Sequence, residues 1–286
     1  MSFCCVIIAA QEATEIYLFD LQEKENTITI SNPVNISNHE GYDNQPNFTE
    51  DGLAVLFSSF RDDQADIAKY SINEGYRNWI TDTEESEFSP MPLPGKKKYF
   101  TCVRLNDDDS QYVYKYAYKN KPPQLLIPNL KVGYYLWFDS KTMITFVIGD
   151  IESLQVSNFK YKIKYPIQNN IGRSLHKIPA TSGLGTNLVS FISLEHEVPE
   201  VYAINPLTSD KKYLTDALEG SQDITWTSKG SLLIAVGDKI YKWKPDNENS
   251  WEPIQIETDM PIEGISRMVI SPDGSKLAVV VLETSK

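Results

Sequence analysis

Histidine is the side chain best suited to acid–base or metal chemistry near neutral pH, and the chain has three. His39 and His196 are each followed by glutamate, but neither has the second histidine that a zinc-binding helix requires. His176 lies between Leu175 and Lys177, a setting more typical of a hydrogen-bonded structural histidine than of a metal ligand. We therefore predict no bound metal, and His176 is the one histidine that would serve a site in the channel described below.

Two groups of aspartates raise the question of calcium binding: Asp62, Asp63 and Asp66, and then Asp107, Asp108 and Asp109. Neither group has the loop of about twelve residues, with a central glycine and a distal glutamate, that a calcium-binding hand needs. Aspartate also favours turns, because its carboxylate bonds nearby backbone groups. We predict that both groups are solvated loop tips.

A complete set of nucleophile, base and orienting group is not recognisable in the sequence. The segment GRSLH at 172–176 has only the first half of a nucleophile elbow and lacks its strand-turn-helix context. A phosphate-binding loop and a paired Cys-x-x-Cys motif are also missing from the sequence. We therefore expect neither catalytic residues nor a cofactor.

The elements that would position any site come from an internal repeat. A turn followed by an alternating apolar run recurs six times, at Gly52, Gly95, Lys141, Gly185, Gly230 and Gly274. The intervals between these turns are 43, 46, 44, 45 and 44 residues. A period of about 40 to 45 residues with glycine-marked hairpins is typical of β-propeller blades of four strands. The sequence therefore predicts an all-β, six-bladed β-propeller.

The last blade is predicted to be closed by both ends of the chain. After Gly274 only two strands fit before Lys286, whereas EIYLFDL at 15–21 and NTITIS at 26–31 match the third and fourth strands of the repeat. Pairing these segments with the strands around 266–282 leaves no unpaired edge in the ring. We predict a single propeller domain over residues 11–286.

Propeller topology gives the polar residues of different blades a shared position. In an antiparallel blade, the loop before the first strand and the loop between the second and third strands lie at the same end, and the first strands line the axial channel. We call this end the channel-mouth face. The candidate ligand-binding residues at this face are Tyr42, Asp43, Gln45, Arg61, Glu87, Tyr134, Arg173, His176, Asp223 and Arg267.

Within this set, five residues are predicted to converge at the mouth itself: Asp43, Glu87, His176, Asp223 and Arg267. The alternative for any single one is structural, because buried polar groups of neighbouring blades often pair with one another. We expect the face as a whole to be the functional one, since binding residues concentrate on loops held by a rigid scaffold.

The first ten residues require a separate interpretation. Phe3 to Ala10 is apolar and ends in small residues, which is typical of the core and cleavage site of a secretory signal. No Lys or Arg precedes Lys24, so the basic start of such a signal is missing, and an ordinary apolar strand is the alternative. We interpret residues 1–10 as a truncated signal peptide, which leaves Cys102 as a buried thiol without a disulfide.

Composition and charge exclude several partner classes. The 286 residues carry a formal net charge of −12, which opposes binding to the phosphate backbone of a nucleic acid or to an anionic membrane surface. The sequence has no apolar run of about eighteen residues, the minimum for a membrane-spanning helix. Hydrophobic residues make up 41% of the chain, as in a globular protein.

For the oligomeric state of the protein, we expect a monomer.

The repeat resembles that of TolB-type propellers. QPNFTEDGLAVLFSSFRDDQADIAKY and ISPDGSKLAVVV look like their QPxFSPDG strand, SxRDG loop and DIY strand. GYDNQP, SEFSP, VGYYLWFD, GRSLHKIP and ISRMVISPDG are similar to segments of secreted TolB-like proteins of unestablished function. The resemblance covers nearly the whole chain and implies the propeller fold, a secreted or periplasmic location and binding of partner proteins.

The chain departs from two relatives of this kind. TolB itself has an additional N-terminal α/β domain with no counterpart before residue 15, so a role in the Tol system is not expected. Related propellers also cap prolyl oligopeptidase-type hydrolases, whose catalytic domain of about 200 residues this length does not supply.

Two functional hypotheses follow. The first is a non-enzymatic, secreted or periplasmic binding module that holds a protein, peptide or glycan at its channel-mouth face. The second is a hydrolase- or lyase-type enzyme, or a metal-binding protein, with a site around His176 in the axial channel. A cluster of carboxylates or histidines at metal-ligand distance from His176 would favour the second.

Overall fold

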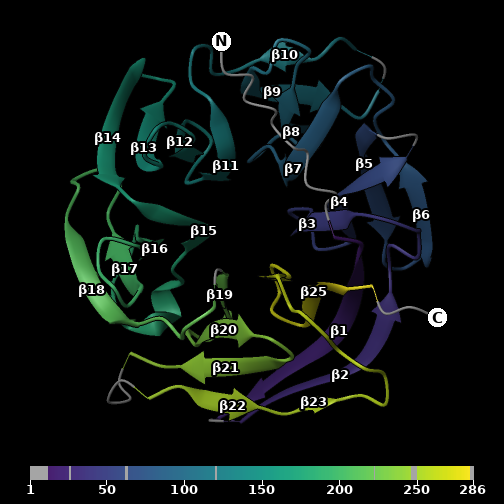
Figure 1. The fold of residues 1–286 in the computed structure, drawn as a ribbon, viewed down its shortest axis with the longest axis vertical. Coiled ribbons are helices and arrows are strands. Elements are labelled where there is room, and N and C mark those ends of the chain that lie inside the picture. Colours follow the sequence, from purple (N-terminus) through teal and green to yellow (C-terminus); the bar gives the residue numbers. More distant parts are fainter. Residues whose placement is uncertain are drawn as a thin grey trace, which may run out of the picture.

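The chain folds into a ring of six β-sheets around a central axis (Figure 1), as the repeat predicts. This computed structural model describes residues 12–25, 27–61, 64–119, 121–221, 223–245 and 250–283. The segment predicted to be a signal-peptide remnant lies outside the described residues, together with Cys4 and Cys5. Cys102 is fully buried and forms no disulfide with any described residue.

Blades 1 to 5 each consist of four consecutive antiparallel strands, with the first strand nearest the axis. Blade 1 contains β3 (Asp43–Phe48), β4 (Ala54–Arg61), β5 (Gln64–Ser71) and β6 (Tyr76–Trp79). Blade 2 contains β7 (Ser86–Pro92), β8 (Tyr99–Leu105), β9 (Gln111–Ala117) and β10 (Gln124–Leu125). Blade 3 contains β11 (Val132–Trp137), β12 (Thr142–Val147), β13 (Ser153–Asn158) and β14 (Ile163–Asn169).

Blades 4 and 5 continue this order around the ring. Blade 4 contains β15 (Ile171–Lys177), β16 (Val189–Ser193), β17 (Glu200–Ile204) and β18 (Lys211–Asp216), with the short 3-10 helix η1 (Ala180–Ser182) after its first strand. Blade 5 contains β19 (Ile224–Trp226), β20 (Leu232–Val236), β21 (Lys239–Trp243) and β22 (Glu252–Ile254).

Blade 6 joins the two ends of the chain, which confirms the predicted closure. Its strands are β24 (Arg267–Ile270), β25 (Lys276–Leu282), β1 (Thr14–Lys24), β2 (Thr27–Asn35) and β23 (Ile256–Glu257). Strand β1 pairs with β25 from Thr14 opposite Leu282 to Asp20 opposite Lys276, and β23 adds to β2 in parallel. Both strands from the N-terminal segment are longer than the sequence predicted.

The hydrophobic core lies between successive blades, because each sheet buries both of its faces against its neighbours. Phe57 of blade 1, for example, packs in one cluster with Ile16 and Val280 of blade 6. Polar side chains also form hydrogen bonds across these interfaces: the indole Nε1 of Trp137 donates to Thr101 Oγ1 of the preceding blade at 2.9 Å. This packing makes the ring a rigid support for the first strands.

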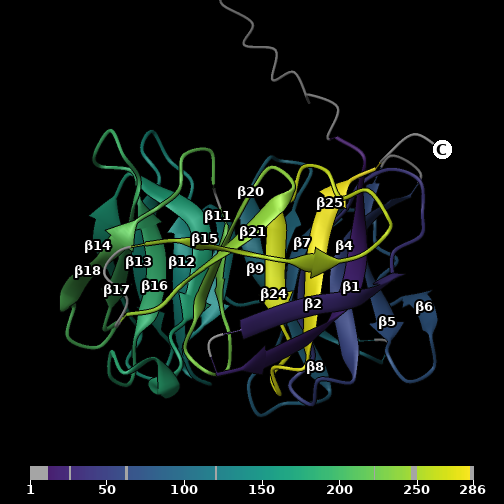
Figure 2. The same cartoon turned by 90° about the horizontal axis from the view of Figure 1, so that it is seen from below.

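The disc has two loop faces, seen edge-on in Figure 2. One is the channel-mouth face, and the other carries the turns between first and second strands, which we call the turn face. On the turn face, Gly230 leaves no room for a side chain: its φ is +89°, and an added Cβ would lie 2.5 Å from Ser182 Cα of the neighbouring blade.

Candidate functional site

A cavity of about 130 Å³ surrounds the axis near the channel mouth and is lined mainly by first strands. Six of the ten candidate residues line it: Gln45, Tyr134, Arg173, His176, Asp223 and Arg267. They come from five different blades. We call this cavity the arginine chamber, because its described lining residues include two guanidinium groups and a single carboxylate.

A second cavity of about 600 Å³ lies below the first and extends to the turn face, where Ser228 and Pro272 line it. Five residues line both cavities: Asn47, Met91, Leu136, His176 and Val269. Each comes from the first strand of a different blade, so together they form a waist that divides the axial channel. His176 therefore lies at the waist, where it lines both the arginine chamber and the second cavity.

Arg173 and Arg267 are the dominant charges of the arginine chamber. Arg173 extends from β15, and its Nη2 donates to the carbonyl oxygen of Ser266 at 3.0 Å, while its buried Nε has no partner among the described residues. Arg267 begins β24, and its guanidinium carbon lies 4.7 Å from the centre of the Tyr134 ring. Burial, and then the neighbouring Arg267 charge, lower the pKa of Arg173.

Two tyrosines border these arginines. Tyr134 packs edge-on against Phe146, with ring centres 5.6 Å apart, while Arg267 lies over its face. Tyr42 does not line the cavity, but it is close enough for the Arg267 and Arg173 charges to act on its hydroxyl. Burial nevertheless raises the pKa of Tyr42 to about 12, so its hydroxyl stays protonated and can donate a hydrogen bond.

Asp223 and His176 form the acid–base part of the chamber. Asp223 Oδ2 accepts the backbone N–H of Met268 at 2.6 Å, which ties blade 5 to blade 6. Burial lowers the pKa of His176, with Asp223 opposing and Arg267 reinforcing the shift, so the imidazole is neutral at pH 7. The described part of the chain holds no group of three or more His, Cys, Asp or Glu residues arranged to bind a metal ion.

Gln45 lines the chamber, but its side-chain oxygen is committed to structure. Gln45 Oε1 accepts from Ser58 Oγ at 3.0 Å and from the backbone N–H of Ser89 at 2.7 Å. The second bond crosses from blade 1 to blade 2. Gln45 therefore fixes the rim of the chamber, while its amide nitrogen donates to no acceptor among the described residues.

Asp43 does not reach the channel, contrary to the prediction. Its side chain is fully buried, and the register of β3 against β4 shifts between Asn44 and Asn47. Gln45, inside this bulge, has a left-handed φ of 57°. A bulge reverses the alternation of side chains, so Asp43 projects away from the face to which Asn47 belongs.

The surroundings of Asp43 are those of a buried acid between blades. Burial raises its pKa to about 7, while the hydroxyl of Ser59 and the charge of Arg77 oppose the shift. Arg77 donates from Nη2 to Ser59 Oγ at 2.7 Å and lies over the Trp79 ring at 4.4 Å. Asp43 belongs to this structural cluster rather than to the mouth.

Glu87 is turned away from the channel by the same device in blade 2. The register of β7 against β8 shifts between Phe88 and Met91, and Ser89 has a φ of 52°. Glu87 is fully buried and accepts hydrogen bonds from Tyr116 at 3.0 Å and from Thr83. Burial raises the pKa of Glu87 well above its usual range.

Arg61 also lies away from the arginine chamber. Its Nε donates to Asp66 Oδ2 at 2.8 Å, and its guanidinium packs 4.7 Å from the Trp79 ring. Asp66 is itself buried in β5, so the prediction that it belongs to a solvated loop tip is wrong. Asp62 and Asp63 lie outside the described residues, whereas Asp107 to Asp109 form an exposed turn as predicted.

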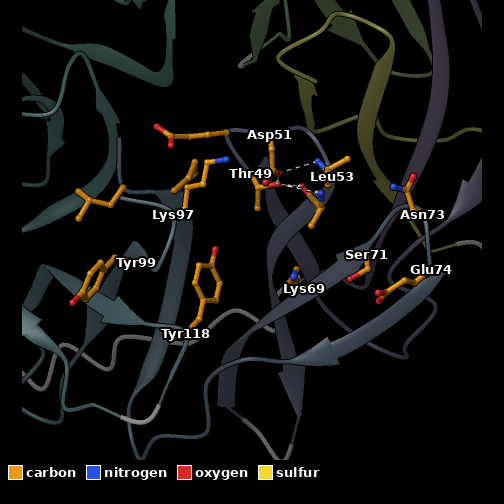
Figure 3. A pocket seen from close by; sticks show the side chains of 14 residues that line it. Thr49, Asp51, Leu53, Lys69, Ser71, Asn73, Glu74, Lys97, Tyr99 and Tyr118 are labelled. Atoms are coloured by element: carbon orange, nitrogen blue, oxygen red, sulfur yellow. Dashed lines mark hydrogen bonds between the residues drawn. The ribbon is translucent and has the colours of Figure 1, made fainter. Parts of the chain in front are cut away.

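A third cavity, of about 340 Å³, lies between blades 1 and 2 on the turn face (Figure 3). Two lysines line it, Lys69 and Lys97, together with three carboxylates. Asp51 accepts from Thr49 Oγ1 at 2.7 Å and from the backbone N–H of Leu53 at 3.2 Å, and these bonds lower its pKa. The two lysines of this cavity are therefore balanced by its carboxylates, and one of these, Asp51, also stabilises the turn.

Two kinds of lining residue were not predicted from the sequence. They are the waist residues other than His176, and the bulge residue Ser89. Asn47 and Val269 lie two residues beyond the predicted residues Gln45 and Arg267 on the same strands, and since that step keeps the same face, alternation could have found them. The bulges gave no such signal, because residues with positive φ there are glutamine and serine and not glycine.

Comparisons with known proteins identify the fold. No protein-family model matches the chain, and no curated protein matches its sequence. A protein assigned as TolB from Agrobacterium tumefaciens superposes with a TM-score of 0.70 at 12% identity, covering 96% of this chain and 99% of that one. TolB from Acinetobacter baumannii gives 0.57 at 12% identity, covering 96% of this chain and 65% of that one.

An enzyme shares the architecture as well. Oligogalacturonate lyase, solved in complex with manganese, gives a TM-score of 0.58 at 10% identity, covering 88% of this chain and 80% of that one. At such identities the likeness concerns the fold alone, so the chain has a TolB-like, six-bladed β-propeller fold that also occurs in a lyase. No helix in the described ranges is long and apolar enough to cross a membrane.

Proposed function

We propose that this protein is a non-enzymatic binding module, periplasmic or secreted, that holds a partner at its channel-mouth face. The observation that carries the proposal is the arginine chamber, which gathers six predicted residues from five blades around the axis. Its polar groups come from rigid strands, so the site is preorganised and loses little conformational entropy on binding. The partner is a protein, a peptide or a glycan.

The location and the binding role are supported by likeness to TolB structures and by the acidic composition. A net charge of −12 opposes self-association, which suits a protein that works in solution outside the cell. Within the described ranges, the titratable groups of the chamber do not form a nucleophile with its own base, which favours binding over turnover.

The experiment compares two faces of the same disc. The purified chain is immobilised and screened against a panel of peptides and oligosaccharides by biolayer interferometry. For ligands that bind, Arg173→Ala should weaken capture by about tenfold or more, because a charged hydrogen bond is lost at the site. Lys97→Ala, on the turn face, is the matched control and should leave capture unchanged. Loss of capture in Lys97→Ala alone would refute the proposal.

The enzymatic alternative rests on His176 and Asp223 in the channel and on the lyase that shares the fold. Elemental analysis of protein purified without chelators, and an activity screen with peptide, ester and glycan substrates, address it directly. Stoichiometric metal that is lost in His176→Ala, or turnover that is abolished in this variant without unfolding, would replace the binding proposal with a catalytic one.

A further inference from the structure

The guanidinium of Arg267 has N–H donors that no acceptor among the described residues uses. In the part of the chain that the structure describes, its side chain makes no hydrogen bond or ion pair and is held only by stacking on Tyr134. An arginine side chain carries five N–H donors in a fixed plane. Its donors therefore face the cavity and are available to a ligand.

Arg173 adds a second set of donors beside the first. Only its Nη2 has a protein acceptor, Ser266 O, and its buried Nε lacks any among the described residues. A buried donor without an acceptor costs free energy unless a ligand or water satisfies it. Two neighbouring guanidinium groups also repel each other, and an anion between them would relieve both costs.

The charge of the chamber follows from the bulges in β3 and β7. Had Asp43 and Glu87 faced the channel, three carboxylates would have met two guanidinium groups there. Because both acids are turned into the blade interfaces, Asp223 is the one carboxylate among the described lining residues. Its Oδ2 is already engaged by the backbone N–H of Met268. The chamber thus keeps an excess of positive charge in an acidic protein.

The size of the chamber limits what it encloses. Sites that bury a whole small molecule measure about 300 to 1,000 Å³. A cavity of about 130 Å³ instead fits one small charged group at the end of a larger ligand. A planar carboxylate matches the fork of a guanidinium through two parallel hydrogen bonds.

The carboxylate of a peptide end suits the chamber better than that of an acidic glycan. A sugar ring normally packs on an open aromatic face, but Arg267 lies over the Tyr134 ring and Tyr42 does not line the cavity. A glycan with many uronate groups would also be repelled by a chain of net charge −12. A single terminal carboxylate avoids both difficulties.

We infer that the arginine chamber binds the C-terminal carboxylate of a peptide or protein, with Arg267 and Arg173 as its direct donors. This inference rests on the proposed function and specifies the ligand class of the same site. The preceding residues of the peptide would lie across the channel-mouth face.

The test uses the full chain and a panel of peptides of varied sequence, each made with a free C-terminal carboxylate and as the amide. For the peptides that bind, amidation should weaken binding by about tenfold or more, since the charged hydrogen bonds are lost. Arg267→Gln should weaken the free acids to the same degree and leave the amides unchanged. Lys97→Gln is the matched control and should behave like wild type.

The outcomes separate this inference from the proposed function. If acids and amides bind equally, and both are weakened by Arg173→Ala, the carboxylate inference is wrong while the binding face stands. If binding is unaffected by Arg173→Ala as well, both are wrong. If no peptide of the panel binds but galacturonate oligomers do, the inference is overturned in favour of a glycan.

Discussion

The first strands of blades 1 and 2 differ from that of blade 6 in one backbone feature, and the difference decides which charges meet at the axis. In β3 and β7 a one-residue bulge follows the acid, so Asp43 and Glu87 are buried between blades. In β24 the pairing from Arg267 to Ile270 is regular, and Arg267 and Val269 both line the chamber.

This comparison shows that an acidic protein can carry a cationic site without additional basic residues. The two bulges remove negative charge from the channel, and Asp223 is then the one carboxylate that the described lining sets against the two arginines. The cost is a pair of carboxyl groups buried in the blade interfaces. The two kinds of strand should therefore respond differently to pH and to mutation.

The largest effect is expected from pH, acting through the bulged strands. The pKa of Asp43 is raised from 3.8 to about 7, so between these values the unfolded chain loses a proton that the folded chain keeps. The free energy of unfolding therefore falls as pH rises through this window, by about 1.4 kcal/mol per pH unit for such a group.

Asp43→Asn removes this contribution, so between pH 5 and pH 7 the stability of wild type should fall relative to the variant by about 2 kcal/mol. Urea unfolding at several pH values measures the difference, and Glu87→Gln should act in the same direction. Parallel pH profiles of wild type and Asp43→Asn would show that Asp43 is not a buried acid.

The second effect concerns the bulge itself. Ser89 has a left-handed φ of 52°, which a β-branched side chain adopts only with strain. Ser89→Val should lower the free energy of unfolding by about 2 kcal/mol. Ser89→Gly is the matched control: it suits this backbone and removes a buried hydroxyl that has no partner among the described residues, so it should be at least as stable as wild type. A stable valine variant would argue against the bulge.

The smallest effect is expected in the regular strand. Arg267 is held by stacking on Tyr134 alone among the described residues, so Arg267→Gln should lower the free energy of unfolding by no more than about 1 kcal/mol. Arg173→Gln should cost more, because it leaves the carbonyl oxygen of Ser266 without its donor. Denaturant midpoints of the two variants compare them, and the reverse order would show that Arg267 is a structural residue.

The fold and part of the site could be predicted from the sequence. The repeat was visible because each blade has its own turn and alternating run, and strand closure followed from counting the strands. Asp223 and Arg267 were expected at the channel mouth, and Tyr134 on the channel-mouth face, because first strands line the channel in every blade; all three line the arginine chamber.

The remaining site residues could not be placed in this way, for two physical reasons. The predicted positions of Asp43 and Glu87 were wrong because bulges at Gln45 and Ser89 interrupt the alternation of side chains. Neither bulge contains a glycine, so the sequence does not indicate it. The predicted position of Arg61 was wrong because a long side chain at a strand end can fold back, and here Arg61 binds Asp66. Which way such groups turn depends on tertiary contacts.

The central claim, that the arginine chamber is cationic, can be tested by locating ions of both signs in one crystal. A crystal soaked in rubidium bromide shows each ion by its own anomalous signal. We expect a bromide peak within hydrogen-bond distance of the Arg267 and Arg173 guanidinium groups, and its loss in Arg267→Gln. A rubidium peak in the chamber, next to Asp223 and without bromide, would contradict the account.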